Sequence, residues 1–164
     1  MDSENQAIAR AFVSTPVGYV ELIACEGKIT GLYFREEAEN EIVPNDLTDA
    51  AYQLKQYFKG ELQNFNLPVS PEGTDFQKKV WELLKEIPYG TTTSYGEISK
   101  KLGMKNGARA VGLANGANPV SIILPCHRVI GQNGKLTGYG GGLWRKEWLL
   151  KMERANLKEG FFSI

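Results

Sequence analysis

The sequence predicts an α+β fold, in which an N-terminal antiparallel β-meander with one helix precedes a mostly helical C-terminal domain containing a helix-turn-helix. Two observations carry this prediction. Residues 8–34 are rich in β-branched and aromatic residues and are interrupted by turn signals, whereas apolar residues recur at helical spacing from residue 47 onward. Residues 64–73 contain two prolines and a glycine and show no period, so we expect a linker there. The predicted domains are residues 1–69, of α/β type, and residues 70–164.

The composition is that of a globular chain, with 42% hydrophobic and 23% charged residues among 164. No apolar run approaches the roughly 20 residues of a membrane span, and the polar, acidic start does not read as a secretory signal. Two cysteines and one histidine are too few for a disulfide framework or a four-ligand zinc site. We therefore expect a cytoplasmic, reduced protein that contains neither a metal nor a membrane segment.

The zero net charge hides an asymmetry between the two predicted domains. Residues 1–69 hold 5 Lys/Arg and 11 Asp/Glu, a net charge of −6, and residues 70–164 hold 14 and 8, a net charge of +6. A basic C-terminal part favours an anionic partner such as nucleic acid. The alternative is that the two parts only neutralise each other.

The N-terminal part contains three short runs of strand-forming residues. Thr15-Pro16 and Glu26-Gly27 are turn signals between them. Strands are therefore expected at residues 8–14, 18–25 and 28–34, with Cys25 in the core. A helix should follow, because apolar residues recur at helical spacing from Leu47 to Leu62, with Asp46 as its cap and Gly60 near its end.

Two capping boxes open the helices of the C-terminal part. Thr74 and Gln77 begin a helix whose apolar stripe reaches Ile87 and which Pro88 ends; the stripe is Phe76, Val80, Leu83, Leu84 and Ile87. Ser94 and Glu97 begin a second, shorter helix that stops at Gly103. A third helix starts at Gly107, and two short helices joined by a glycine-containing turn form a helix-turn-helix, here expected to be winged-helix-like.

The third of these helices carries almost only small side chains, namely Gly107, Ala108, Ala110, Gly112 and Ala114. A helix that reads bases normally presents long polar side chains. This helix could instead approach a groove closely while Arg109 projects from it, which favours insertion over sequence reading. The alternative is that its small residues pack against a neighbouring helix.

Three further segments complete the chain. Val120–Leu124 is an apolar run that we expect to be a short strand. Residues 132–142 form a glycine-rich loop that lacks both the dinucleotide fingerprint and the phosphate-loop motif. Leu143–Arg154 should be the final helix, and its solvent-facing side carries Glu147, Lys151 and Arg154. Glu153 lies instead between the directions of Leu149 and Leu150.

Cys126-His127 is the sharpest chemical feature of the sequence. A thiolate is a strong nucleophile, and a nearby histidine can activate it. Adjacent residues of a strand point to opposite faces, so the chain must bend here, as Pro125 permits, or a water must bridge the two side chains. Glu153 is the best candidate to orient the histidine. The alternative is a buried, unreactive cysteine.

The residues around this pair resemble one family. The motif Pro125-Cys-His-Arg-Val-Ile130 is flanked by Gly90, Ser94-Tyr95, residues 108–112, residues 118–120, Gly138-Tyr139, residues 141–143, residues 146–150 and Glu153. This pattern, which covers residues 74–155, is similar to that of the O6-alkylguanine-DNA alkyltransferases, also called methylated-DNA–protein-cysteine methyltransferases. Residues before 74 resemble the family only in their strand-then-helix layout.

The resemblance implies a DNA-repair reaction that needs no cofactor. Cys126 would take the alkyl group from the O6 atom of guanine, giving an S-alkylcysteine and consuming the protein. His127 would act as base through a water, and Glu153 would hold its tautomer. Asn118 would join the same network and brace the turn around the cysteine.

The resemblance also implies how the lesion is bound. Tyr95 would donate to the guanine N3 atom, the carbonyls of Cys126 and Val129 would accept from the exocyclic amine, and the Gly140 N–H, beside Tyr139, would meet O6. The nucleotide would be flipped out of the duplex. Arg109 would fill the gap from the minor groove, and small neighbours such as Ala108 would allow close approach. A monomer should suffice.

The sequence also permits other functional assignments. Many family members have Ser where Gly140 stands, which leaves the tolerance for bulky alkyl groups open. The non-catalytic alkyltransferase-like proteins have another residue, commonly Trp, at the cysteine position, so Cys126 argues against that assignment. A transcription-regulator module and a cysteine hydrolase are weaker alternatives. The zinc ligands of some N-terminal domains in the family have no counterpart here.

Overall fold

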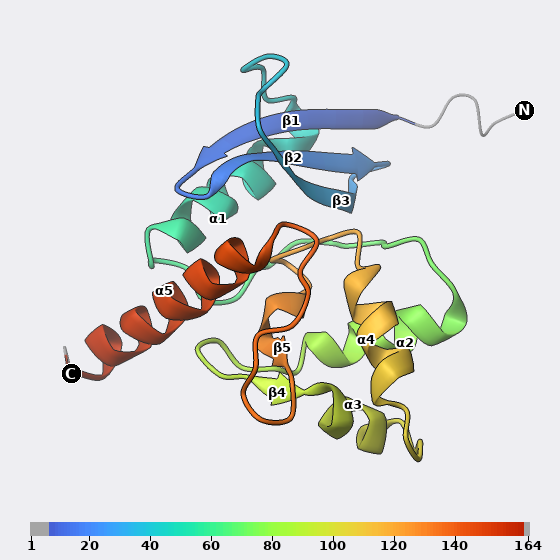
Figure 1. Cartoon of the computed structure of the whole chain (residues 1–164). Helices are drawn as coiled ribbons and strands as arrows, with labels where there is room; N and C mark the ends of the chain where they lie inside the picture. The colour runs from blue at the N-terminus through green and yellow to red at the C-terminus, as the bar shows by residue number, and fades with distance from the viewer. Residues whose placement is uncertain (1–6, 163–164) are drawn as a thin grey trace, which may run out of the picture. The chain divides into compact units, whose positions relative to one another are not determined.

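The computed structural model describes the backbone of residues 7–162 and the side chains of residues 7–157. The chain divides into two compact units, with the division between Glu72 and Gly73. Figure 1 traces their elements in chain order, and each unit is described by itself. Antiparallel strands followed by helices confirm the predicted α+β class.

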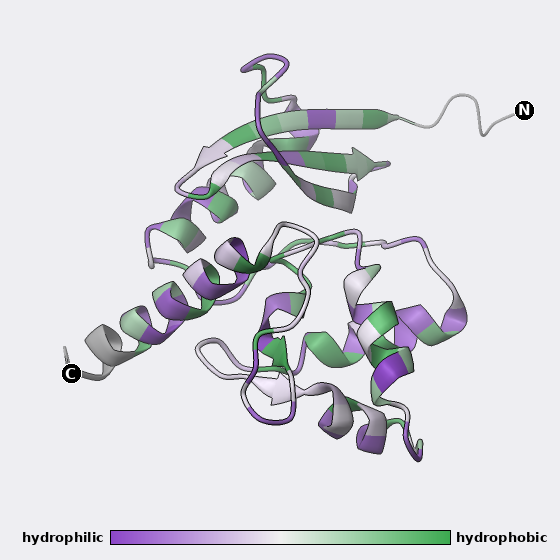
Figure 2. Ribbon diagram, viewed as in Figure 1, coloured by the Kyte–Doolittle hydropathy of each residue, from purple (hydrophilic) through white to green (hydrophobic). Residues whose placement is uncertain are grey.

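The first unit is built on the predicted three-stranded meander. Strands β1 (Ile8–Thr15), β2 (Gly18–Cys25) and β3 (Lys28–Arg35) pair antiparallel in the order β1-β2-β3. The strands are largely hydrophobic with isolated hydrophilic residues (Figure 2), and the paired residues Ala11, Leu22 and Leu32 are fully buried. Cys25, expected in the core, is only half-buried because it ends β2 beside the turn to Lys28.

Helix α1 (Thr48–Phe58) buries Ala50, Ala51, Leu54 and Tyr57. The expected cap was wrong. Asp46 lies inside a short 3-10 helix (Asn45–Leu47), and Leu47, which makes no side-chain cap, occupies the position before α1. The reason is local, since the Leu47 N–H already donates to the Pro44 carbonyl at 2.9 Å. Gly60, at φ 77°, follows the helix as expected.

The segment without periodicity is anchored to the first unit. The Ile29 N–H donates to the Pro68 carbonyl and the Ser70 N–H donates to the Ile29 carbonyl, each at 2.8 Å. These two bonds form a parallel bridge between Ile29 and Val69. They involve no side chain, which is why the sequence pattern does not reveal them.

Helix α2 (Asp75–Leu84) opens the second unit with both bonds of the predicted capping box between Thr74 and Gln77. It ends earlier than expected, so Ile87 is buried in the turn beyond it and not on its stripe. Trp81, which the predicted stripe omits, is 2% exposed and its indole N–H donates to the Ala114 carbonyl at 2.8 Å. This bond ties α2 to α4.

Helices α3 (Tyr95–Lys101) and α4 (Ala108–Gly116) pack against each other and are joined by residues 102–107. Ser94 accepts from the Glu97 N–H at 3.1 Å, and Gly103 has φ 72° just after α3. Both features were expected from the sequence, but the second bond of the predicted capping box is not formed, and the Glu97 carboxylate lies 3.5 Å from Lys100 Nζ instead. The winged-helix-like character of this pair stays a prediction.

The predicted strand at Val120–Leu124 is wrong, because residues 121–123 form a turn. The Leu124 N–H donates to the Val120 carbonyl at 3.0 Å, and Ile122 adopts φ 72°, which is unusual for a β-branched residue. The actual short pairing is parallel, between β4 (Thr93–Ser94) and β5 (Val129–Ile130). It places the start of α3 beside the segment that carries the cysteine.

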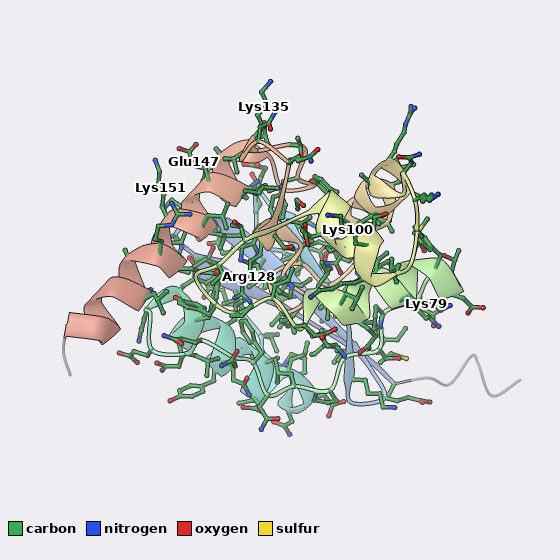
Figure 3. All side chains as sticks on the ribbon, turned by 90° about the horizontal axis from the view of Figure 1, so that it is seen from below. Lys79, Lys100, Arg128, Lys135, Glu147 and Lys151 are labelled. Carbon is green, nitrogen blue, oxygen red and sulfur yellow. The ribbon has the colours of Figure 1, made fainter. Side chains whose placement is uncertain are left out.

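Helix α5 (Leu143–Phe162) is longer than the expected Leu143–Arg154. Leu149 and Glu153 are fully buried on it, whereas Glu147, Lys151 and Arg154 are exposed, as the helical period predicted. Glu147 and Lys151 project together from its outer side in Figure 3. No helix among the described residues is long and apolar enough to cross a bilayer.

Candidate active site

The cysteine lies in a tight turn and not on a strand. Pro125 has φ −79° and ψ 66°, and Cys126–Arg128 form one turn of 3-10 helix directly before β5. All three side chains are buried. The bend that Pro125 permits is therefore present, and the strict alternation of side chains along a strand does not apply to Cys126 and His127.

Glu153 is the hub of the buried polar cluster. The His127 Nε2 atom lies 2.7 Å from its Oε2 atom, and Arg128 binds both carboxylate oxygens, through Nε at 2.9 Å and Nη2 at 3.0 Å. The Gly90 N–H donates to Oε1 at 3.2 Å. Arg128 also donates to the Ile87 carbonyl at 2.8 Å. It lies among the inner side chains in Figure 3.

These contacts determine the protonation states of the pair. Burial acts to raise the pKa of Glu153, but the hydrogen bonds from His127 and Arg128 outweigh it and hold the pKa well below its usual range. Burial lowers the pKa of His127 below its ordinary value of about 6.5. A carboxylate beside a neutral imidazole requires the proton on Nε2. The Nδ1 atom is then a free acceptor, and it is buried without a partner within residues 7–157.

Cys126 is 4% exposed, and burial raises the pKa of its thiol. Hydrogen bonds with the Asn118 and Ser121 side chains and the positive charge of Lys146 act in the opposite direction. The resting group is therefore a thiol whose surroundings favour the thiolate once a base removes the proton.

Lys146 is a member of the site that our sequence reasoning did not single out, although it lies in a segment of the family pattern. Its side chain is fully buried, and its Nζ atom donates to the Thr137 carbonyl at 3.0 Å and lies 6.0 Å from the centre of the Tyr95 ring. Burial lowers the pKa of Lys146, and the nearby Cys126 opposes this shift. A signal was present, because Lys146 is two helical turns before Glu153 and shares its face.

Two asparagines shape the turn. Asn118 accepts from the Val120 N–H at 3.0 Å and donates from Nδ2 to the Leu124 carbonyl at 2.8 Å, so it braces both ends of the 120–124 turn. Asn115 donates to the Cys126 carbonyl at 3.2 Å, as does the Val129 N–H. Both lone pairs of that carbonyl are thus engaged, and a substrate amine would have to share the oxygen.

The other residues expected to bind the lesion differ in their exposure. Tyr95 is linked through its hydroxyl to Thr137 Oγ1 at 2.6 Å, and Val129 is buried on β5. The Tyr139 hydroxyl oxygen is buried, and burial raises its pKa well above the ordinary value. Gly140 is exposed and open on its Cβ side.

Arg109 and Ala108 stand apart from the buried cluster, since both are exposed in the first turn of α4. In the described part of the chain, no group of three or more His, Cys, Asp or Glu side chains is placed to hold a metal ion. The chemistry available at the site is that of a buried thiol, a neutral imidazole with a free Nδ1, a carboxylate and a lysine.

Comparison with known proteins agrees with this chemistry. Residues 75–155 match the family model "6-O-methylguanine DNA methyltransferase, DNA binding domain", and residues 8–71 match that of its ribonuclease-like domain. A methylated-DNA–protein-cysteine methyltransferase of Methanosarcina acetivorans is 49% identical over 150 residues, covering 87% of this chain and 96% of that protein.

The chain is also similar to solved structures of O6-methylguanine methyltransferases. The O6-methylguanine methyltransferase of Mycobacterium tuberculosis superposes with a TM-score of 0.83 at 44% identity, covering 92% of this chain and 94% of that one. A structure of the M. tuberculosis protein in complex with DNA gives a TM-score of 0.82 at 46% identity, covering 90% and 93%. The chain therefore belongs to the 6-O-methylguanine DNA methyltransferase family.

Proposed function

We propose that this protein repairs O6-alkylguanine in double-stranded DNA by transferring the alkyl group to Cys126, once per molecule. The observation that carries the proposal is the buried Cys126 turn beside the His127–Glu153 pair, with its 2.7 Å contact. Membership of the family and the relative solved with DNA support DNA as the partner.

The proposed reaction is an in-line displacement at the alkyl carbon. A water bound to the free Nδ1 of His127 passes the thiol proton of Cys126 to the imidazole, and Glu153 stabilises the imidazolium that forms. The S–C bond forms as the C–O6 bond breaks, and the electron pair stays with guanine. The charge of Lys146 stabilises the developing thiolate. Asn118 keeps the turn in place.

Guanine leaves as an anion that has to be stabilised and protonated. Tyr95 donates to N3, the Gly140 N–H beside Tyr139 meets O6, and the Val129 carbonyl accepts from the exocyclic amine. The product is a thioether, which water does not cleave under mild conditions. One protein molecule therefore repairs one lesion, and it needs no dimer partner to do so.

The pH dependence of transfer should follow the two shifted groups. Because the pKa of His127 is lowered and the pKa of Cys126 is raised, the neutral imidazole and the thiol coexist around neutral pH. The single-turnover rate is expected to be flat between about pH 7 and 8 and to fall only below about pH 6.5, where an ordinary imidazole already takes up its proton. A rate that rises about tenfold per pH unit across neutrality would indicate a free thiolate without a base.

Arg109 is proposed to enter the duplex from the minor groove and fill the space of the flipped guanine. Arg109→Ala should slow transfer from a duplex lesion by roughly 10²-fold or more, since the flipped state loses its support. Its reaction with free O6-benzylguanine, which needs no flipping, should stay within about twofold. Equal losses on both substrates would refute the insertion role.

Treatment with free O6-benzylguanine also tests the function itself. We expect the protein to lose its activity on lesion-bearing duplex in proportion to the benzyl groups it takes up. A non-catalytic lesion-binding protein, the second candidate, would keep its DNA binding and take up no benzyl group. The presence of Cys126 within the buried cluster favours the first outcome.

A further inference from the structure

Leu113 is the most exposed of the large apolar side chains among the described residues, at 74%. A single exposed leucine needs no explanation by itself. The position of Leu113 on α4, however, relates it to Arg109. Arg109 and Leu113 are four residues apart, so they lie on one face of the helix, about 6 Å apart along its axis.

This exposed face of α4 is otherwise made of small residues. Val111, Ala114 and Asn115 are buried on the inner side. The remaining exposed residues of α4 and its C-terminal cap are Ala108, Gly116 and Ala117, and Gly112 is half-buried between them. Arg109 and Leu113 are therefore the only long side chains that extend from this face.

Internal packing does not explain the two glycines in α4. A Cβ atom at Gly112 would make only ordinary contacts with the Tyr95 ring, at 3.7 and 3.8 Å, and one at Gly116 would meet nothing within 4 Å. Neither residue has a positive φ. In the helix interior, Gly112 costs about 1 kcal/mol relative to alanine. With small residues at these positions, no other long side chain protrudes next to Arg109 and Leu113.

The charge around this face suits duplex DNA. Residues 95–116 contain Lys100, Lys101, Lys105 and Arg109 against Glu97 alone, which is 4 − 1 = +3. They lie inside the stretch that matches the family's DNA-binding domain. Proteins that enter the minor groove often combine a cationic side chain with an apolar wedge set against sugars and base steps.

We infer that Leu113 is a second DNA-contacting side chain, an apolar wedge that packs against the deoxyribose and base edges one helical turn from Arg109. Arg109 occupies the gap in the stack, and Leu113 holds the neighbouring step open. This inference rests on the proposed function, because it assigns a further residue to the recognition of the same lesion.

The test compares Leu113→Ala with a matched control, Ile42→Ala, whose side chain is 71% exposed and lies outside the DNA-binding stretch. The probe is a duplex with one O6-methylguanine. Leu113→Ala should bind it about tenfold more weakly and react with it about tenfold more slowly, as expected for the loss of one apolar contact. Ile42→Ala should match the wild type in both measurements.

Two further readouts separate this role from others. With Leu113→Ala the reaction with free O6-benzylguanine should be unchanged, and the slope of log affinity against log salt should stay as in the wild type, whereas Arg109→Ala should reduce that slope by about 1. Wild-type affinity and rate for the duplex, or an equal loss on the free base, would overturn the inference. The affinity for the duplex tests the role of Leu113 even if no alkyl group is transferred. A failure of the proposed function can therefore be distinguished from a failure of this inference.

Discussion

Cys126→Ser is expected to abolish alkyl transfer completely while leaving duplex binding unchanged. The substitution is nearly isosteric in a position that is 4% exposed, so the turn should keep its shape. A serine hydroxyl, however, ionises far less readily than a thiol, and the His127–Glu153 pair is arranged to remove a thiol proton. The measurement is a single-turnover assay on a methylated duplex, with binding followed in parallel.

The other cysteine provides the matched control. Cys25 is half-buried at the end of β2 in the first compact unit, whereas the residues of the site belong to the second. Cys25→Ser should retain the wild-type rate and stoichiometry. If Cys126→Ser still removed alkyl groups from DNA, Cys126 would not be the nucleophile.

Glu153→Gln should have the second-largest effect, on both rate and stability. The carboxylate accepts from Gly90, His127 and twice from Arg128. A glutamine replaces one of its oxygens with a donor and leaves the buried Arg128 without a counter-charge. We expect the free energy of unfolding to fall by about 3–5 kcal/mol. Transfer should slow by roughly 10²–10⁴-fold, the usual contribution of an oriented general base.

Urea unfolding and single-turnover kinetics at a temperature where the variant is folded measure the two effects separately. Glu147→Gln is the control on the same helix, since its carboxylate is exposed and pairs with Lys151 at 2.8 Å. Its unfolding free energy should change by less than about 1 kcal/mol and its rate not at all. A destabilised Glu153→Gln protein with an unchanged rate would restrict Glu153 to a structural role.

The parts of the fold that the sequence predicted are those governed by local patterns. Runs of strand-forming residues between turn signals located β1 to β3, and the capping box at Thr74 located the start of α2. The helical period of residues 143–154 singled out Glu153 as a carboxylate on an apolar side, and its side chain is fully buried. The same period could have identified Lys146.

Periodicity failed where a side chain bonds to the backbone. An apolar run such as Val120–Leu124 fits a strand equally well, and the turn is held by the two bonds of Asn118, which hydrophobic periodicity does not encode. Arg128 reaches Ile87 and Glu153 across 41 and 25 residues of sequence. Such contacts depend on the tertiary fold, so its anchoring role could not be predicted from the sequence.

The most direct test of the account is intact mass spectrometry with peptide mapping after the protein meets a duplex carrying one O6-methylguanine. We expect a gain of one methyl group per protein, located on the peptide that contains Cys126, with no second turnover. No gain in mass despite measurable lesion binding, or a methyl group on any other residue, would contradict it.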